Sequence, residues 1–70
     1  MHSIYKRIVR GETPPAGMIV ELCRSNWPAS PSVIESFVAD GRWTVPSTAE
    51  GFYYRAASEA DIQQAIAQYF

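Results

Sequence analysis

The chain has 70 residues, which is enough for one small domain spanning residues 1–70. Its composition, 47% apolar and 19% charged, is typical of a globular protein rather than a disordered one. No uninterrupted apolar run exceeds three residues, as in Met18-Ile19-Val20, so a membrane-spanning helix is excluded. Cys23 is the sole cysteine, which excludes an internal disulfide and a Cys-rich zinc site and favours a reducing, cytoplasmic setting.

The charge is unevenly distributed along the chain. The formal net charge is −1, which argues against a strong nucleic-acid binder. Residues 1–10 nevertheless carry Lys6, Arg7 and Arg10 without an acid, whereas residues 11–70 carry three arginines against seven acids. The basic start of the chain is therefore weak evidence for an anionic partner.

The first half of the chain shows apolar residues at helical spacing. Residues 4–10 place them at i, i+1, i+4 and i+5, which predicts a helix of about two turns. Residues 16–25 repeat this spacing and predict a second helix. Because Ile and Val also favour sheets, strands remain the alternative for residues 4–10 and 18–24.

The next segment carries clear start and stop signals. Ser30 and Pro31 suit the N-cap and first position of a helix, so we expect a helix over residues 30–40 that ends at Gly41. Residues 42–46 and 51–56 then alternate apolar and polar side chains around turn-forming residues, which predicts a β-hairpin.

The last element is a helix over residues 58–69, because Ser58 can cap it and Glu59 and Asp61 suit its first turn. No cluster of residues has the spacing of a metal site or a catalytic site, so we expect no enzyme, no metal and no cofactor. We expect Cys23 to be buried and six residues to share one core: Phe37, Val38, Trp43, Tyr54, Ile62 and Ile66.

This order of elements resembles the winged helix-turn-helix family. Met18 to Cys23 stands where the first helix of the motif lies, and Ser30-Pro31-Ser32-Val33-Ile34 begins the recognition helix. Phe37 to Trp43 is similar to the helix end that leads into the wing, and Gly51-Phe52-Tyr53-Tyr54-Arg55 to its aromatic return strand. The resemblance implies a mainly α fold with a small β-hairpin, as in small bacterial and phage regulators and excisionase-like factors.

The resemblance also implies DNA binding, in transcription regulation or as a recombination accessory factor. Most contacts should go to phosphates, because the outward face of the third helix lacks Lys, Arg, Asn and Gln. The expected DNA-binding residues are Lys6, Arg7, Arg10, Ser32, Ser36, Arg42 and Arg55.

Two alternatives stay open. The first is a protein-binding module on the same scaffold, such as a phage-encoded inhibitor of a host protein, with a homodimer through the C-terminal helix as a further expectation. Its candidate contacts are Trp27, Glu35, Asp40, Tyr69 and Phe70. In the second, residues 4–10 and 18–24 form a β-hairpin, and the chain is an α+β domain without an implied DNA contact.

Overall fold

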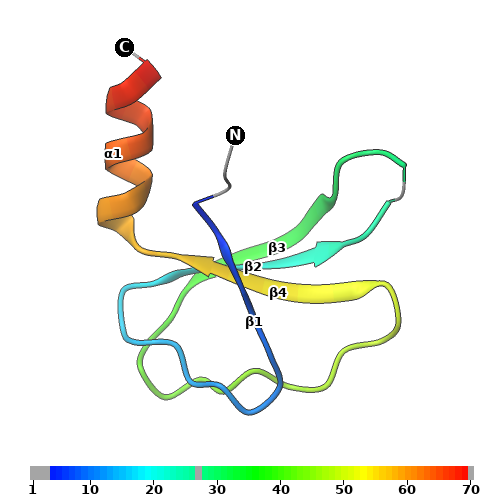
Figure 1. The fold of residues 1–70 in the computed structure, drawn as a ribbon. Coiled ribbons are helices and arrows are strands. Elements are labelled where there is room, and N and C mark those ends of the chain that lie inside the picture. Colours follow the sequence, from blue (N-terminus) through cyan, green and yellow to red (C-terminus); the bar gives the residue numbers. More distant parts are fainter. Residues whose placement is uncertain (1–3, 27, 70) are drawn as a thin grey trace.

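The structure is a computed structural model that describes residues 4–26 and 28–69, with the side chain of Tyr69 left undescribed. Within this part, four strands precede one helix: β1 (Lys6–Ile8), β2 (Ile19–Arg24), β3 (Ser32–Val38), β4 (Phe52–Ala57) and α1 (Glu59–Tyr69). The strands form one antiparallel sheet in the order β1-β4-β2-β3 (Figure 1). The winged-helix prediction is therefore wrong, and the fold is α+β.

The predicted helices over residues 16–25 and 30–40 are largely the strands β2 and β3. β2 lies between two strands, and apolar side chains on both of its faces are covered, including the fully buried Val20 and Cys23. Consecutive apolar positions in such a strand imitate the stripe of a helix. Leu22 of β2 pairs with Glu35 of β3, but the next residue, Cys23, pairs with Val33. Ile34 is therefore the extra residue of a bulge in β3, which interrupts the alternation that identifies a strand.

The first predicted helix, residues 4–10, contains the three-residue strand β1. The alternative of strands in residues 4–10 and 18–24 is therefore right, but their pairing as a hairpin is wrong. β4 lies between β1 and β2 and pairs with both of them.

The predicted hairpin of residues 42–46 and 51–56 is wrong in its first strand. Residues 42–46 form an irregular connection whose buried Val45 exchanges backbone hydrogen bonds with Gly11 and Glu12 (3.0 and 2.8 Å). Its second strand exists as β4, but its partners are distant in sequence. The Asp40-Gly41 turn is present: Asp40 accepts the backbone N–H groups of Arg42 and Trp43 (2.8 and 2.9 Å), and Gly41 has a φ of 85°.

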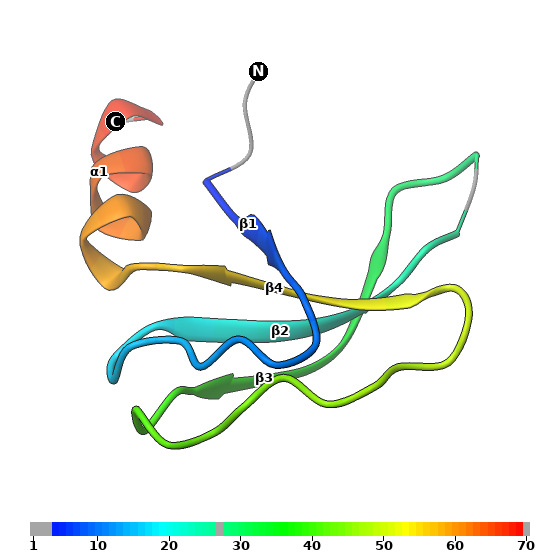
Figure 2. The same ribbon diagram turned by 60° about the horizontal axis from the view of Figure 1, so that its bottom comes forward.

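The core lies on one face of the sheet, which we call the covered face. Residues 9–18 and 39–51 pass across this face (Figure 2). Trp43 packs edge-to-face against Phe37 and Tyr54, with ring centroids 4.8 and 5.1 Å apart. The core prediction is confirmed for these three residues. It is wrong for two others that are exposed, Val38 (62%) and Ile66 (48%), and Ile62 is outside the main cluster.

The C-terminal helix is confirmed, including its cap. The hydroxyl of Ser58 accepts the backbone N–H of Asp61 at 3.1 Å. α1 does not lie over the sheet but extends from it, with Ile4 beside its residues Asp61 and Gln64 (Figures 1 and 2). The second face of the sheet, which we call the open face, is therefore left without a covering helix.

Candidate nucleic-acid interface

A hollow of about 310 Å³ lies where β1 separates from β4. β1 pairs with β4 only as far as Ile8 opposite Tyr54, while β4 extends back to Phe52. The connection after Val45 closes the other side, where the hydroxyl of Thr48 donates to the carbonyl of Phe52 at 3.1 Å. We call this space the basic hollow; ten residues line it: Arg7, Ile8, Val9, Arg10, Val45, Pro46, Ser47, Thr48, Tyr53 and Tyr54.

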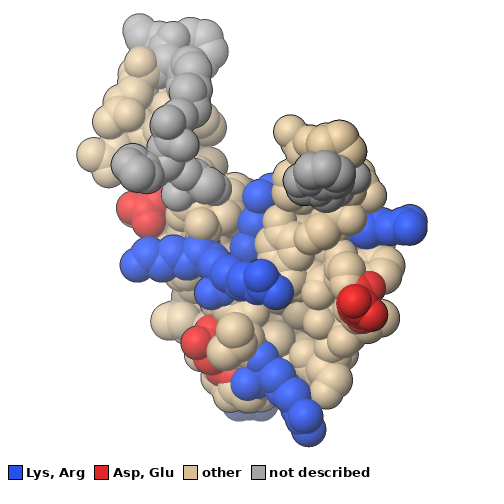
Figure 3. All heavy atoms as spheres, turned by 45° about the vertical axis from the view of Figure 1, so that its right-hand side comes forward, with Lys and Arg blue, Asp and Glu red and all other residues tan. Residues whose placement is uncertain are grey.

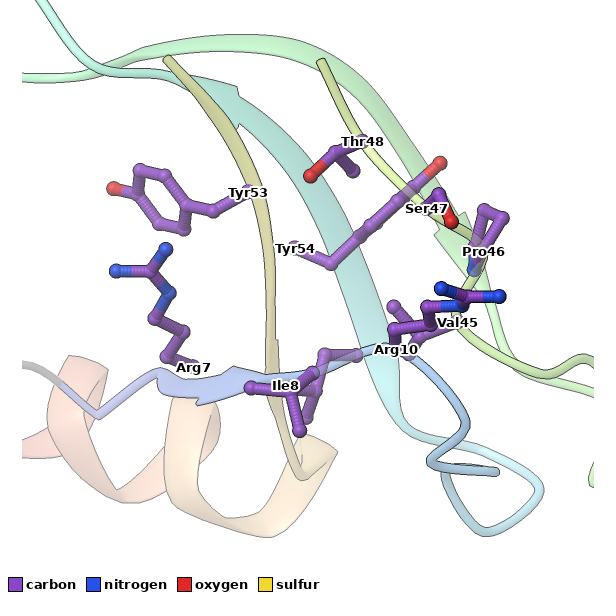
Figure 4. A pocket seen from close by; sticks show the side chains of 10 residues that line it. Arg7, Ile8, Arg10, Val45, Pro46, Ser47, Thr48, Tyr53 and Tyr54 are labelled. Atoms are coloured by element: carbon purple, nitrogen blue, oxygen red, sulfur yellow. The ribbon is translucent and has the colours of Figure 1, made fainter. Parts of the chain in front are cut away.

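Two arginines enter the basic hollow from opposite ends (Figure 4). Arg7 lies over the ring of Tyr53, with its guanidinium carbon 5.0 Å from the ring centroid. Arg10 lies beside Val45 and Pro46. None of the described residues that line the hollow is acidic, and Ser47 and Thr48 add hydroxyl groups. Guanidinium groups and hydroxyls are donors for phosphate oxygens, and an exposed aromatic ring can stack on a base.

Glu12, an acid close in sequence to Arg10, is engaged in the turn that follows β1. A carboxylate oxygen of Glu12 accepts the backbone N–H of Val9 at 3.2 Å. This bond, together with the bond from the N–H of Glu12 to the carbonyl of Val9 (3.0 Å), holds the turn that brings Arg10 to the hollow. Glu12 therefore positions the basic segment and is not one of the lining residues.

Arg55, an expected phosphate contact, is committed to an ion pair on the open face. Its Nε donates to Glu21 at 2.7 Å, and both side chains are largely buried. Its guanidinium also lies 4.6 Å from the ring centroid of Tyr5. Burial acts to lower the pKa of Arg55, but the bond to Glu21 and the electrostatic effects of Cys23, Glu21 and Tyr53 together outweigh it, so the pKa is raised. Burial, and then the charge of Glu21, raise the pKa of Tyr5. This cluster is structural.

The structure thus separates the predicted DNA-binding residues. Lys6 and Arg7 lie on β1 and Arg10 shortly after it; Arg7 and Arg10 line the basic hollow, whereas Lys6 does not. Ser32 and Ser36 lie on β3 at the opposite edge of the sheet and belong to no recognition helix. Arg42 lies in the turn after Asp40 and does not line the basic hollow.

Further residues were missed by the sequence analysis. Tyr53 was recognised only as a strand residue and Tyr54 only as a strand and core residue, although aromatic side chains beside basic ones can stack on bases. Ser47 and Thr48 carry no such signal. Arg24, on β2, lies with its guanidinium carbon 5.8 Å from the ring centroid of Phe52, the first residue of β4. On the face in Figure 3, basic side chains lie across the middle and also at the right-hand and lower margins, and acidic ones lie toward the left and right.

Of the residues expected to bind a protein partner, the structure describes the side chains of Glu35 and Asp40. Glu35 is exposed on β3. Asp40 is used within its turn, where the N–H groups of Arg42 and Trp43 lower the pKa of its carboxyl group. Trp27, Phe70 and the side chain of Tyr69 lie outside the described residues.

Other kinds of site find little support in the described part of the chain. Its His, Cys, Asp and Glu side chains form no group of three that could hold a metal ion. Cys23 is fully buried, as expected, and this burial raises the pKa of its thiol. The helix that the structure describes is too short to cross a membrane.

The chain matches no protein-family model, no curated protein and no solved structure.

Proposed function

We propose that this protein binds single-stranded nucleic acid, with phosphates at Arg7 and Arg10 and an unpaired base near Tyr53. The observation that carries the proposal is the basic hollow: two arginines and the half-buried ring of Tyr53 around one space, without an acid among the described lining residues. Its volume of about 310 Å³ is at the lower end of the range for small-molecule sites, which suits a group of nucleotide size.

We expect a single strand rather than a duplex, because the helix of the described part is poorly suited to a duplex groove and an unpaired base can stack on an aromatic ring. The only helix in the described part, α1, carries Glu59 and Asp61 in its first turn and no basic residue in its last turn, so it is poorly suited to a major groove. A stacking ring, in contrast, can bind any unpaired base, because every base has an aromatic face. Phosphate contacts position the strand without reading its sequence. We therefore expect little sequence preference.

The affinity should be modest and dependent on salt. Lys6, Arg7 and Arg10 supply three phosphate contacts at most. For single strands each contact contributes about −0.7 to the slope of log affinity against log salt concentration, which gives about −2. This function places the protein in the cytoplasm, where nucleic acid is present and the free thiol of Cys23 stays reduced.

Fluorescence anisotropy with a labelled oligothymidylate at several salt concentrations tests the proposal. The double variant Arg7→Ala/Arg10→Ala should reduce the slope by about 1.4, because two phosphate contacts are lost. Arg42→Ala removes the same kind of charge outside the basic hollow and should leave the slope unchanged. Tyr53→Leu should weaken binding about tenfold without changing the slope, because it removes stacking but no charge.

Three results would contradict the proposal: no binding at low salt, equal effects of Arg7→Ala and Arg42→Ala, or preferential binding of a duplex of equal length. Absence of binding would leave the protein-binding module as the better hypothesis. The observation in its favour is the exposed strand β3, whose only charged residue is Glu35.

A further inference from the structure

The connection that leads into β4 takes the place of β1 beside the first residue of that strand. β1 pairs with β4 only as far as Ile8 opposite Tyr54, so it does not reach Phe52. The N–H of Phe52 donates instead to the carbonyl of Ala49 at 3.1 Å, and the carbonyl of Phe52 accepts the hydroxyl of Thr48 at 3.1 Å. These two residues therefore satisfy the backbone of β4 where β1 leaves the sheet.

The bond to Phe52 fixes the direction in which the hydroxyl of Thr48 donates. A carbonyl oxygen can only accept, so the one hydrogen of this hydroxyl is directed at Phe52. The hydroxyl oxygen keeps the capacity to accept a hydrogen bond from another group. The side chain of Thr48 is exposed and lines the basic hollow, so a ligand in the hollow can reach it. Toward that ligand Thr48 is an acceptor and not a donor.

A phosphate of the nucleic-acid backbone is therefore not the partner of Thr48. Phosphodiester oxygens carry no hydrogen and can only accept, so they suit the guanidinium groups of Arg7 and Arg10, which can only donate. Figure 4 shows the hydroxyl of Thr48 in the upper part of the view, separate from both guanidinium groups, which lie lower. The basic hollow thus offers donors for phosphate in one part and an acceptor in another.

We propose that Thr48 accepts a hydrogen bond from a ribose 2′-hydroxyl, so that the strand bound in the basic hollow is RNA. The 2′-hydroxyl can donate, and DNA lacks it. Base N–H groups also donate, but their positions differ from base to base, whereas every ribonucleotide carries the 2′-hydroxyl at the same place. The hollow then has one group for each part of a nucleotide: arginines for the phosphates, Tyr53 for the base and Thr48 for the sugar. This inference rests on the proposed function and names its substrate class.

Fluorescence anisotropy with oligouridylate and oligodeoxyuridylate of equal length tests the substrate class. The two strands carry the same base and the same charge and differ only in the 2′-hydroxyl. We expect the RNA strand to bind about fivefold more tightly, which is the effect of one neutral hydrogen bond. This ratio should be the same at every salt concentration, because the contact that distinguishes the strands involves no net charge.

A 2′-fluoro oligouridylate of the same length separates the hydroxyl from the shape of the sugar. Fluorine at this position favours the sugar conformation of RNA but brings no hydrogen that can be donated. Because Thr48 acts as the acceptor, the 2′-fluoro strand should bind as weakly as the DNA strand. This comparison uses the unaltered protein, so it decides the contact without any substitution.

Substitutions of Thr48 test the residue. Thr48→Val removes the hydroxyl with little change of shape and should bind RNA and DNA equally, whereas Thr48→Ser keeps the hydroxyl and should keep the fivefold preference. Thr44→Val is the matched control and should also keep it, since Thr44 is exposed but its hydroxyl bonds to that of Thr13 (2.8 Å), outside the lining of the hollow. Circular dichroism should show that the variants are folded, because Thr48→Val also removes the bond to Phe52.

Equal binding of RNA and DNA by the parent protein would overturn this inference and leave the proposed function intact. Binding of the 2′-fluoro strand as tight as that of RNA would mean that the protein reads the sugar conformation and not the hydroxyl. A preference that survives Thr48→Val but is lost in Ser47→Ala would overturn the assignment to Thr48. Absence of binding to every strand at low salt would instead refute the proposed function, and this inference with it.

Discussion

Phe37 and Val38 are neighbours in sequence, and the structure gives them opposite roles. In the expected helix both side chains belong to one buried stripe, whereas in β3 successive side chains point to opposite faces. Phe37 packs on Trp43 within the core, and Val38 is 62% exposed. Truncating each side chain to alanine therefore measures how this segment is folded.

Phe37→Ala should lower the free energy of unfolding by about 3 kcal/mol. Burial of a phenylalanine in a core is worth about 3–5 kcal/mol, and the lower end applies because Phe37 is only partly buried. The edge-to-face contact with Trp43, worth about 0.5–1.5 kcal/mol, is included in this loss. Val38→Ala should cost about 0.5–1 kcal/mol, because it removes strand propensity and little buried area.

Urea denaturation followed by far-ultraviolet circular dichroism measures both changes. A domain of this size has a denaturant slope of about 1 kcal/mol per molar urea, so Phe37→Ala should lower the midpoint by about 3 M and Val38→Ala by less than about 1 M. Measurement at low protein concentration keeps any self-association from contributing. Equal losses for the two variants would refute the strand assignment and restore the helix.

Two further predictions concern titratable groups. The bonds from Arg42 and Trp43 lower the pKa of Asp40, so they stabilise the fold at any pH above the ordinary carboxyl pKa of about 3.9. This stabilisation is lost as the pH falls through the lower pKa of the folded state. Thermal unfolding should show a larger drop in stability below about pH 4 for the parent than for Asp40→Asn, and identical pH profiles would contradict this. Cys23 should react with a thiol reagent only on unfolding, because burial raises its pKa and blocks access; rapid labelling of the folded protein would show that it is exposed.

Several local features could be predicted from the sequence, because each depends on residues close together in the chain. The cap of α1 needs only Ser58 and the backbone of Asp61. The turn at Gly41 needs a carboxylate at Asp40 and a residue that adopts positive φ without strain. These interactions form over three or four residues and leave direct signals in the sequence.

The candidate site could be predicted only in part. Lys6, Arg7 and Arg10 stand out as a basic segment, but the hollow depends on the pairing of β1 with β4, whose residues lie more than 40 positions later. The loss of Arg55 from the site also follows from register, because Glu21 and Arg55 lie opposite each other across β2 and β4. A list of charged residues cannot distinguish a free guanidinium from a paired one.

The sequence by itself determined the capped helix α1, the Asp40-Gly41 turn, the burial of Cys23 and the aromatic residues of the core. Only the tertiary structure decided that residues 19–24 and 32–38 are strands, and which faces they cover. Short apolar segments carry nearly equal preferences for helix and strand, since a strand buried on both faces loses its alternation. These segments form strands because β4, which lies far along the chain, pairs with β1 and β2. This pairing buries Val20 and Ala56 in one core with Trp43 and its neighbours.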